Sequence, residues 1–581
     1  MIADKQKTPL LITVGTAVVF ILGGAAAYWF LTQRTGSSGE MPTGANIIPQ
    51  DALMTVSVTT NETQWERLRE FGTPETQAAF DQTLVSFRDR FLATNGFNYQ
   101  EDIQPWVGQE ITFAFLAQKT PAAASDSPTP PPAVVTGDQS VVMILPVANP
   151  LRAKQVLDKQ ASQNTTEWQK REYKGIQVQE SRDPNASSFS TAVLEGRFLV
   201  VSNDPQAIDR TIDTHKGTPS LAATAGFGQA LNQIQTASSF ARIFVNVPEA
   251  AAFASTNSAR PVPPEELAKL RQNQGIAATV SLESEGVRVR GISWLNPKSE
   301  KQHLVDNSAN SMPSRLPVDT VMMVSGGNLQ RLWQDYSQGA AANPVALINP
   351  EQMRLALSQT TGLNLDNDLL NWMGGEFSLS VVPSAQTTPG LLPLGFVFMV
   401  EASDRRAAEK ALERLDGVMS DKYKFKVEEG KVGNLAVVNW QPTFPLSITR
   451  GWLDNQTAFL AVGAPITEAF TPKPQSPLAA NPLYASTVPT DLEPNNGHFY
   501  IDMNRAFNDQ TLALPIVPPN QQTWLKAINS LGVTAAVTSA RTTRYDVFVN
   551  LKKGAKPTPL PPPALETPTS PVPEAESEST N

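Results

Sequence analysis

The sequence predicts an α+β protein made of two tandem copies of a mixed domain, each with a largely antiparallel sheet and helices mainly on one face, behind an N-terminal transmembrane helix. Three observations carry this prediction. They are a long uncharged segment near the N-terminus, a series of short runs in which apolar and polar residues alternate, and a set of motifs that occurs twice in the same order.

The uncharged segment is the first element along the chain. The 22 residues from Leu10 to Leu31 carry no formal charge, and as a helix they would span roughly 33 Å, enough to cross a bilayer once. Lys5 and Lys7 precede the segment, so the positive-inside rule predicts a cytoplasmic stub at 1-9 and a body on the periplasmic or thylakoid-lumenal side. A cleaved signal peptide is the competing interpretation, but the apolar run is longer than an ordinary signal-peptide core.

Segments with little apolar periodicity divide the rest of the chain. We expect a flexible linker at 32-46, a disordered Pro-rich insertion at 118-139, a linker at 297-315, and a disordered Pro-rich acidic tail at 554-581. The stretches 47-296 and 316-553 remain, and each is long enough for one domain.

These two stretches share a signature that predicts a duplication. A Pro-x-Asp motif leads into an apolar strand in both, a tryptophan follows it at the same separation, and the motif Asp-x3-Trp-x-Gly-x-Glu comes next in both. Matching motifs in matching order indicate two copies of one domain. The signature residues are Asp51, Trp65, Asp102, Trp106, Gly108 and Glu110 in the first copy, and Asp319, Trp333, Asp368, Trp372, Gly374 and Glu376 in the second.

Strands and helices follow from the periodicity within each copy. Alternating apolar residues predict half-buried strands beginning near Met54 and Ile111, and the continuous runs Val141 to Leu145 and Phe396 to Val400 predict strands covered on both faces. Asn149 followed by a proline is typical of a helix start. Closely spaced strands late in each copy predict hairpins.

The signature carboxylates are the first candidates for chemistry. Glu110 and Glu376 lie two residues after a glycine and four after a tryptophan, where partial burial could raise a carboxyl pKa and suit it to acid or base catalysis. The structural interpretation is favoured: the tryptophan fills the core and the carboxylate accepts hydrogen bonds from nearby amides or a basic side chain. A cluster of acidic and amide side chains from Asn364 to Asp368 could bind a hard cation, but a helix-capping role is favoured. We therefore predict no catalytic residue, no metal site and no cofactor.

Composition excludes several classes of protein. The chain has no cysteine, which rules out disulfides, thiolate metal sites and cysteine nucleophiles. Lys and Arg number 46 against 55 Asp and Glu, giving a net charge of −9. This balance argues against nucleic acid as a partner, because such binding depends on clustered basic residues.

The N-terminal span, the Pro-x-Asp strands and the repeated Trp-x-Gly-x-Glu motif together resemble the uncharacterised domain of unknown function 3352, which is associated with cyanobacterial membrane-anchored proteins. The resemblance covers roughly residues 1 to 553. It implies a body on the periplasmic or thylakoid-lumenal side of a membrane, and it brings no activity and no catalytic residues.

The predicted function therefore depends on architecture. The leading hypothesis is a membrane-anchored, non-enzymatic interaction or assembly protein that binds other membrane or extracytoplasmic proteins. The alternative is a carrier for lipid, pigment or another apolar ligand in a groove of the sheet. A hydrolase assembled from dispersed residues is a third hypothesis, without a motif to support it.

Overall fold

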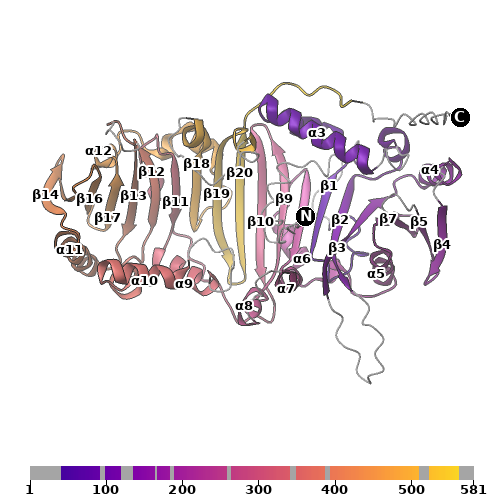
Figure 1. Ribbon diagram of the computed structural model, residues 1–581, viewed down its shortest axis with the longest axis horizontal. Coiled ribbons are helices and arrows are strands. Elements are labelled where there is room, and N and C mark those ends of the chain that lie inside the picture. The colour runs from indigo at the N-terminus through magenta and orange to yellow at the C-terminus, as the bar shows by residue number, and fades with distance from the viewer. Residues whose placement is uncertain are drawn as a thin grey trace, which may run out of the picture.

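The computed structural model describes residues 41–91, 98–119, 135–163, 167–182, 189–257, 264–340, 349–386, 393–508 and 523–561. Their strands form one antiparallel sheet of 20 strands, which runs along the whole length of the molecule (Figure 1). Strands β1 to β10 make up the first half and strands β11 to β20 the second half. The halves meet where β10 pairs with β20.

The first half contains ten strands and seven α-helices among the described residues. The strands are β1 (Met54–Thr59), β2 (Glu110–Lys119), β3 (Val135–Pro146), β4 (Glu167–Tyr173), β5 (Ile176–Arg182), β6 (Ser190–Leu194), β7 (Phe198–Ser202), β8 (Ala241–Asn246), β9 (Asn273–Glu283) and β10 (Gly286–Leu295). The helices are α2 (Glu62–Arg69), α3 (Pro74–Phe91), α4 (Pro150–Gln163), α5 (Pro205–His215), α6 (Phe227–Gln233), α7 (Val247–Asn257) and α8 (Pro264–Leu270), with short helical turns η3 (Tyr99–Ile103) and η4 (Leu221–Ala223).

The second half has the same number of strands and fewer α-helices in its described part. The strands are β11 (Met322–Gly326), β12 (Phe377–Pro383), β13 (Leu394–Glu401), β14 (Lys426–Val432), β15 (Leu435–Gln441), β16 (Ser447–Trp452), β17 (Thr457–Gly463), β18 (Gly497–Asp502), β19 (Ile528–Ser539) and β20 (Thr542–Leu551). The helices are α9 (Leu329–Ala340), α10 (Pro350–Thr361), α11 (Arg405–Asp421), α12 (Thr467–Phe470) and α13 (Pro482–Thr487), with turns η5 (Met312–Ser314), η6 (Leu365–Leu369), η7 (Leu370–Trp372), η8 (Leu478–Ala480) and η9 (Asn504–Asn508).

The strand order is the same on both sides of the central pair. From one edge it reads β4-β5-β6-β7-β3-β2-β1-β8-β9-β10, and from the other edge it reads β14-β15-β16-β17-β13-β12-β11-β18-β19-β20. Each strand of the first half therefore has a counterpart ten numbers later. We use this order and the register of the ladders to compare positions in the two halves.

Local sequence explains where the helices begin. Asn61 and Asp204 accept hydrogen bonds from the first backbone amides of α2 and α5, and Asn349 does the same for α10. A proline follows the cap in α5 and α10, where its fixed φ suits the first helical position. The helix α10 ends at Gly362, which has a φ of 73° that favours glycine.

Helices cover both faces of the sheet in the first half. On β2, Ile111 packs in one hydrophobic cluster with residues of α2 and α3, while Ala114 and Leu116 pack in another cluster with residues of α5 and α6. We call these the α3 face and the α5 face. Successive side chains of a strand point to opposite faces, and residues paired across neighbouring strands point to the same face. The pairing register therefore assigns the strand residues of the whole sheet to the α3 face or to the α5 face.

The large antiparallel sheet and mixed α/β composition are confirmed, but several details differ from the prediction. The two sets of strands form one continuous sheet, and helices lie on both faces because each face of the central strands is apolar. The strands β2 and β3 extend into the expected insertion at 118-139, of which residues 120–134 lie outside the described part. The tail at 554-581 was expected to be disordered throughout, yet residues 554–561 lie against α2 and α3.

Candidate functional site

The Asp and Trp of the signature build the same turn in both halves. The Asp102 carboxylate accepts a hydrogen bond from the Asn98 backbone amide at 2.8 Å, and the Trp106 indole N–H donates to the Asp102 carbonyl. Asp368 and Trp372 repeat these contacts, at 2.7 Å to the Asn364 amide and 3.2 Å to the Asp368 carbonyl. These groups satisfy backbone donors and acceptors at the start of a helical turn.

The two signature glutamates anchor the chain that crosses the α5 face. Glu376 is 4% exposed and accepts hydrogen bonds from the backbone amides of Asn310, Ser311 and Met312 and from the Ser311 hydroxyl. Glu110 accepts from the Thr43 amide and pairs with Arg242. The acceptor positions of both carboxylates are thus used by structural donors.

The remaining signature residues differ between the halves. Trp65 is 1% exposed and donates its indole N–H to the Thr59 carbonyl, whereas Trp333 is only partly buried and lies 5.8 Å from the Arg354 guanidinium. Asp51 forms an ion pair with Arg210, while the carbonyl of Asp319 accepts from Arg505. Side chains at Gly108 and Gly374 would press on Pro146 and Ser403, respectively. The structure distributes these residues along both halves and does not bring them together into one site.

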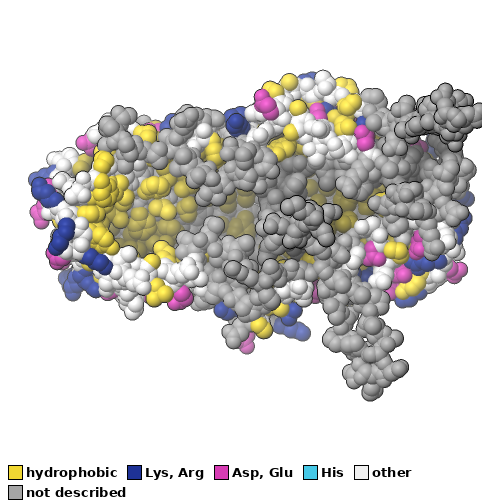
Figure 2. All heavy atoms as spheres, viewed as in Figure 1, with side chains coloured by type: hydrophobic (Ala, Val, Ile, Leu, Met, Phe, Trp, Pro, Cys, Tyr) yellow, Lys and Arg dark blue, Asp and Glu magenta, His cyan; other side chains and the backbone are white. Residues whose placement is uncertain are grey.

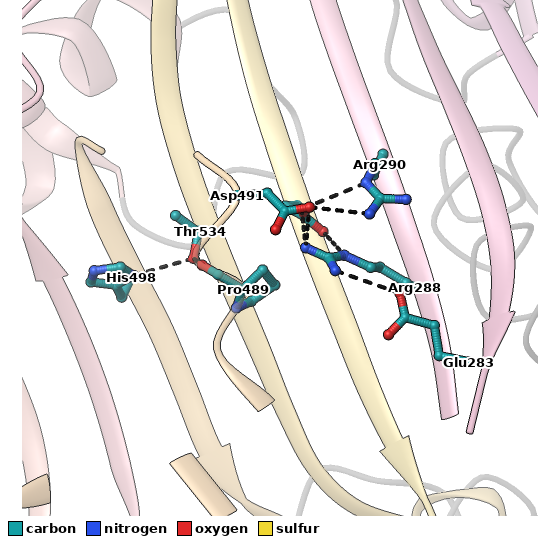
Figure 3. Close-up of polar contacts among 8 residues, drawn as sticks. Glu283, Arg288, Arg290, Pro489, Asp491, His498 and Thr534 are labelled. Carbon is teal, nitrogen blue, oxygen red and sulfur yellow. Dashed lines mark hydrogen bonds and ion pairs between the residues drawn. The ribbon is translucent and has the colours of Figure 1, made fainter. Parts of the chain in front are cut away.

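An ion-pair network joins the halves on the α5 face (Figure 3). Asp546 of β20 is 1% exposed and accepts two hydrogen bonds from Arg288 of β10, at 2.8 and 2.7 Å. Asp491 reaches over both arginines of β10, at 2.9 Å from Arg288 and 3.1 Å from Arg290. Every charged group of this network has an opposite charge beside it, which is the pattern of a structural junction.

His498 lies on the same face of β18, two strands from the network (Figure 3). Its ring nitrogen Nδ1 is 3.2 Å from the Thr534 hydroxyl, which donates to the Pro489 carbonyl at 2.6 Å. Burial lowers the pKa of His498 to about 4. The imidazole is therefore neutral at pH 7 and pairs with a hydroxyl already committed to the backbone.

The α3 face of the second half carries a continuous row of apolar side chains. The register places Leu379 of β12 opposite Val324 of β11 on one side and Phe398 of β13 on the other. The row ends at Arg450 of β16, which binds Asp416. We call the apolar members the central row: Phe499, Val324, Leu379, Phe398 and Leu460.

This row forms the floor of an open apolar trough. Leu379 is 44% exposed and Phe396, in the next row, is 50% exposed. Hydrophobic clusters close both ends of the strands: one contains Phe377 and Trp372, and the other contains Val381 and Ile501. Figure 2 shows the resulting hollow, filled with hydrophobic side chains over the second half of the sheet.

Strand geometry gives the dimensions of the trough. Val381 lies four positions after Phe377, so the band between the closed ends is about 13 Å wide at roughly 3.3 Å per residue. The row crosses β18, β11, β12, β13, β17 and β16, which at about 4.8 Å between strands makes it roughly 24 Å long. A band of these proportions suits an elongated apolar group.

The equivalent row of the first half is partly buried and packs against a hydrophobic cluster that includes residues of α3. Its members are Ile243, Val56, Phe113, Met143 and Val201, and all five pack against the cluster that contains Phe80 and Leu84 of α3. In the second half, α10 occupies the same place in the chain as α3, but Pro350 is its only buried residue, and Met353 and Leu355 are 41% and 59% exposed. The trough is open because α10 does not pack over it.

The profile of a protein family described as "Protein of unknown function (DUF3352)" matches residues 13–551, which is most of the chain. The chain belongs to the DUF3352 family. No curated protein matches it. Two solved structures show a local likeness: crystal form III of TP0453 is 8% identical with a TM-score of 0.23, and crystal form I is 6% identical with a TM-score of 0.22. Each match covers 45% of this DUF3352 chain, and 82% and 81% of the other chain, respectively.

The described part of this DUF3352 chain contains neither a helix that could span a membrane nor a cluster of side chains that could hold a metal ion. No helix there is long and apolar enough to cross a membrane, and the predicted span from Leu10 to Leu31 lies outside it. No group of three or more acidic or histidine side chains in that part is placed to hold a metal ion.

Sequence reasoning missed the trough. The run Phe396 to Val400 was expected to be covered on both faces, and Phe377, Leu379 and Val381 were expected to form the buried face of a strand. The one available signal was the size of the apolar side chains: α10, with the sequence PEQMRLALSQTT, has no aromatic residue, whereas α3 carries three phenylalanines. Aromatic side chains bury more area than aliphatic ones, so α10 gains less than α3 by packing on a sheet.

Proposed function

We propose that this chain is a membrane-anchored, non-enzymatic binding protein whose trough holds the acyl chain of a lipid. The observation that carries the proposal is the exposure of Leu379 and Phe396 at the floor of a hollow that is closed at both ends. Apolar side chains in the middle of a sheet are ordinarily covered, and burying a Leu or Phe side chain is worth about 1.5–3 kcal/mol. Exposed apolar surface of this kind marks a binding site.

Lipid is the apolar molecule that the proposed anchor brings within reach. Residues 32–40 separate the predicted span from the first described residue, and nine extended residues reach at most about 30 Å. The body would thus stay close to the bilayer surface. A lipid chain also matches the trough in shape, since the floor is long, narrow and lined by aliphatic and aromatic side chains.

Membrane topology and duplication belong to the same proposal. The segment from Leu10 to Leu31 would cross the membrane once, with the body periplasmic or in the thylakoid lumen of a cyanobacterium, as the family resemblance implies. The identical strand order on both sides of the β10–β20 pair and the repeated turn at Asp102 and Asp368 support two copies of one domain. Both signature glutamates bind structural donors, which supports a role without catalysis.

An assembly role would use the same surface for an apolar segment of a protein partner. The experiment that separates the two functions is photo-crosslinking of the full chain, reconstituted into nanodiscs that contain a lipid with a diazirine in its acyl chain. Mass spectrometry then maps the crosslinked peptides. We expect crosslinks in β12 and β13, in addition to the anchor segment.

Matched variants make the result decisive. Leu379→Glu together with Phe396→Glu should abolish the crosslinks in β12 and β13, because a charged floor rejects hydrocarbon. Leu151→Glu is the control, since Leu151 is 77% exposed on α4, away from the trough. Crosslinks confined to the anchor in the unmodified chain would contradict the lipid proposal, and a co-purifying protein lost only in the trough variant would favour the assembly role.

A further inference from the structure

The helix α3, which packs over the first half, is held by the segment that follows β20. After β20, residues 554–561 cross from the second half onto α2 and α3, and Figure 1 shows this segment passing over α3. Gln77 of α3 donates to the Ala555 carbonyl at 2.9 Å, and Arg69 of α2 donates to the Thr558 carbonyl at 2.6 Å. Arg88 of α3 donates to the Pro561 carbonyl, and Leu560 packs against the cluster beneath. We call residues 554–561 the strap.

The composition of the strap suits this use. Pro557, Pro559 and Pro561 have no backbone N–H and restrict φ, so the segment loses little entropy when it is held extended and offers carbonyls as acceptors. Gln77, Arg69 and Arg88 donate to its carbonyls, and Gln77 Oε1 also accepts a hydrogen bond from the Ala555 amide at 3.2 Å. The strap therefore recognises these two helices through its backbone, in the way that proline-rich ligands are bound.

We propose that the first half contains a second, latent apolar site of the same kind as the trough, kept closed by α3 and locked by the strap. The ligand class rests on the proposed function, namely an acyl chain, whereas the closed site itself rests on the structure. Its floor is the row Ile243, Val56, Phe113, Met143 and Val201, which lies in register with the central row.

The two halves supply the argument for opening. The central row of the second half occupies the equivalent surface, and no helix of the described part packs over it. Its strands are nevertheless paired, so strand pairing in this sheet does not require a covering helix. What distinguishes α3 from α10 is its apolar stripe of Phe80 and Leu84 and its attachment to the strap. Removal of the strap leaves the stripe, the Arg69–Asp81 ion pair and the Gln77 contact with the Arg69 carbonyl to hold α3 in place. The loss of the strap contacts lowers the free energy of local opening.

The absence of cysteine from the sequence permits a direct test. Val56→Cys places a thiol under α3, and Val324→Cys places one at the equivalent position of the trough. Both changes nearly conserve side-chain volume. The rate of modification by a maleimide is measured on the full chain in nanodiscs, on a chain ending at Lys553, which lacks the strap, and on a control chain ending at Pro561, which keeps it.

We expect Val324→Cys to react rapidly in all three chains. Val56→Cys should react more slowly than Val324→Cys in the full and control chains and at least about tenfold faster without the strap, since access to a partly buried thiol beneath α3 follows the population of the open state. Equal Val56→Cys rates in the chains ending at Lys553 and Pro561 would overturn the proposal.

Two additions keep the outcomes separate. If loss of the strap unfolds the chain, seen as a change in circular dichroism, Leu560→Ala in the full chain decides instead, because Leu560 belongs to the strap itself. Faster modification of Val56→Cys supports the lock and an unchanged rate refutes it. Photo-crosslinking of the chain ending at Lys553 then tests the ligand. An open first half without lipid crosslinks in β2 and β3 would refute the acyl-chain site while leaving the strap as the lock.

Discussion

The junction between the halves allows a sharp test of the packing argument, through Asp546→Leu. Asp546 is 1% exposed and holds Arg288 by two hydrogen bonds at 2.8 and 2.7 Å, while Arg288 itself is 14% exposed. The substitution leaves a largely buried guanidinium with Asp491 as its nearest partner, at 2.9 Å. Removing one partner of a buried ion pair lowers the free energy of unfolding by about 3–5 kcal/mol. Because Asp491 remains beside Arg288, we expect a loss at the low end of this range, about 3 kcal/mol.

Chemical denaturation followed by circular dichroism measures this loss as a lower midpoint at unchanged slope. Asp491→Asn is the matched control, because its side chain is 50% exposed and an exposed partner contributes at most about 1 kcal/mol. The double variant Arg288→Met with Asp546→Leu removes both charges and should be more stable than Asp546→Leu alone. A loss for Asp546→Leu no larger than that for Asp491→Asn, or a double variant less stable than either single one, would refute the reasoning.

Three further predictions follow from burial. Because burial lowers the pKa of His498 to about 4, the unfolded chain takes up the proton first, and the free energy of unfolding should fall by roughly 2–3 kcal/mol as the pH drops from 7 to 4; His498→Gln should lack that part of the pH dependence. Trp65→Ala should cost about 3–5 kcal/mol, and Trp333→Ala clearly less, since only Trp65 is fully buried; equal shifts in midpoint would contradict this. Glu376→Gln should cost about 2–3 kcal/mol in the same assay, because the amide presents donors to backbone N–H groups that need an acceptor.

The sequence predicted the strands well because their signal is local. The strand from Met54, the runs beginning at Val141 and Phe396, and the helix after Asn149 all appear as β1, β3, β13 and α4. The pairing of β10 with β20 could not be predicted in this way. Alternation fixes which side chains share a face but not which two edges meet, and the charges that mark this edge, Arg290 opposite Asp546, have no special spacing along the chain.

Whether a half is covered depends on the path of the segment that follows a last strand, and local sequence patterns do not report that path. Because the two halves have the same strand order, the segment after β10 is expected to pack on α9 in the way that the strap after β20 packs on α2. That segment does approach α9, since Arg331 and Asp335 act electrostatically on His303. It must then turn to the α5 face, where Met312 is buried and Glu376 holds the backbone, because it has to lead into β11. In the described part of the chain, the segment after β20 leads into no further strand, and it runs along α3.

In the proposed duplication, this difference explains why one half is covered and the other open. In that proposal the two copies have equivalent helices, and the strap lies against the helices of the first copy. With α3 held by the strap, Phe80 and Leu84 pack in the core and stabilise the first half. Without such a support α10 gains little from apolar side chains, and the face beneath it, with Leu379 and Phe396 at the floor, stays open to a ligand.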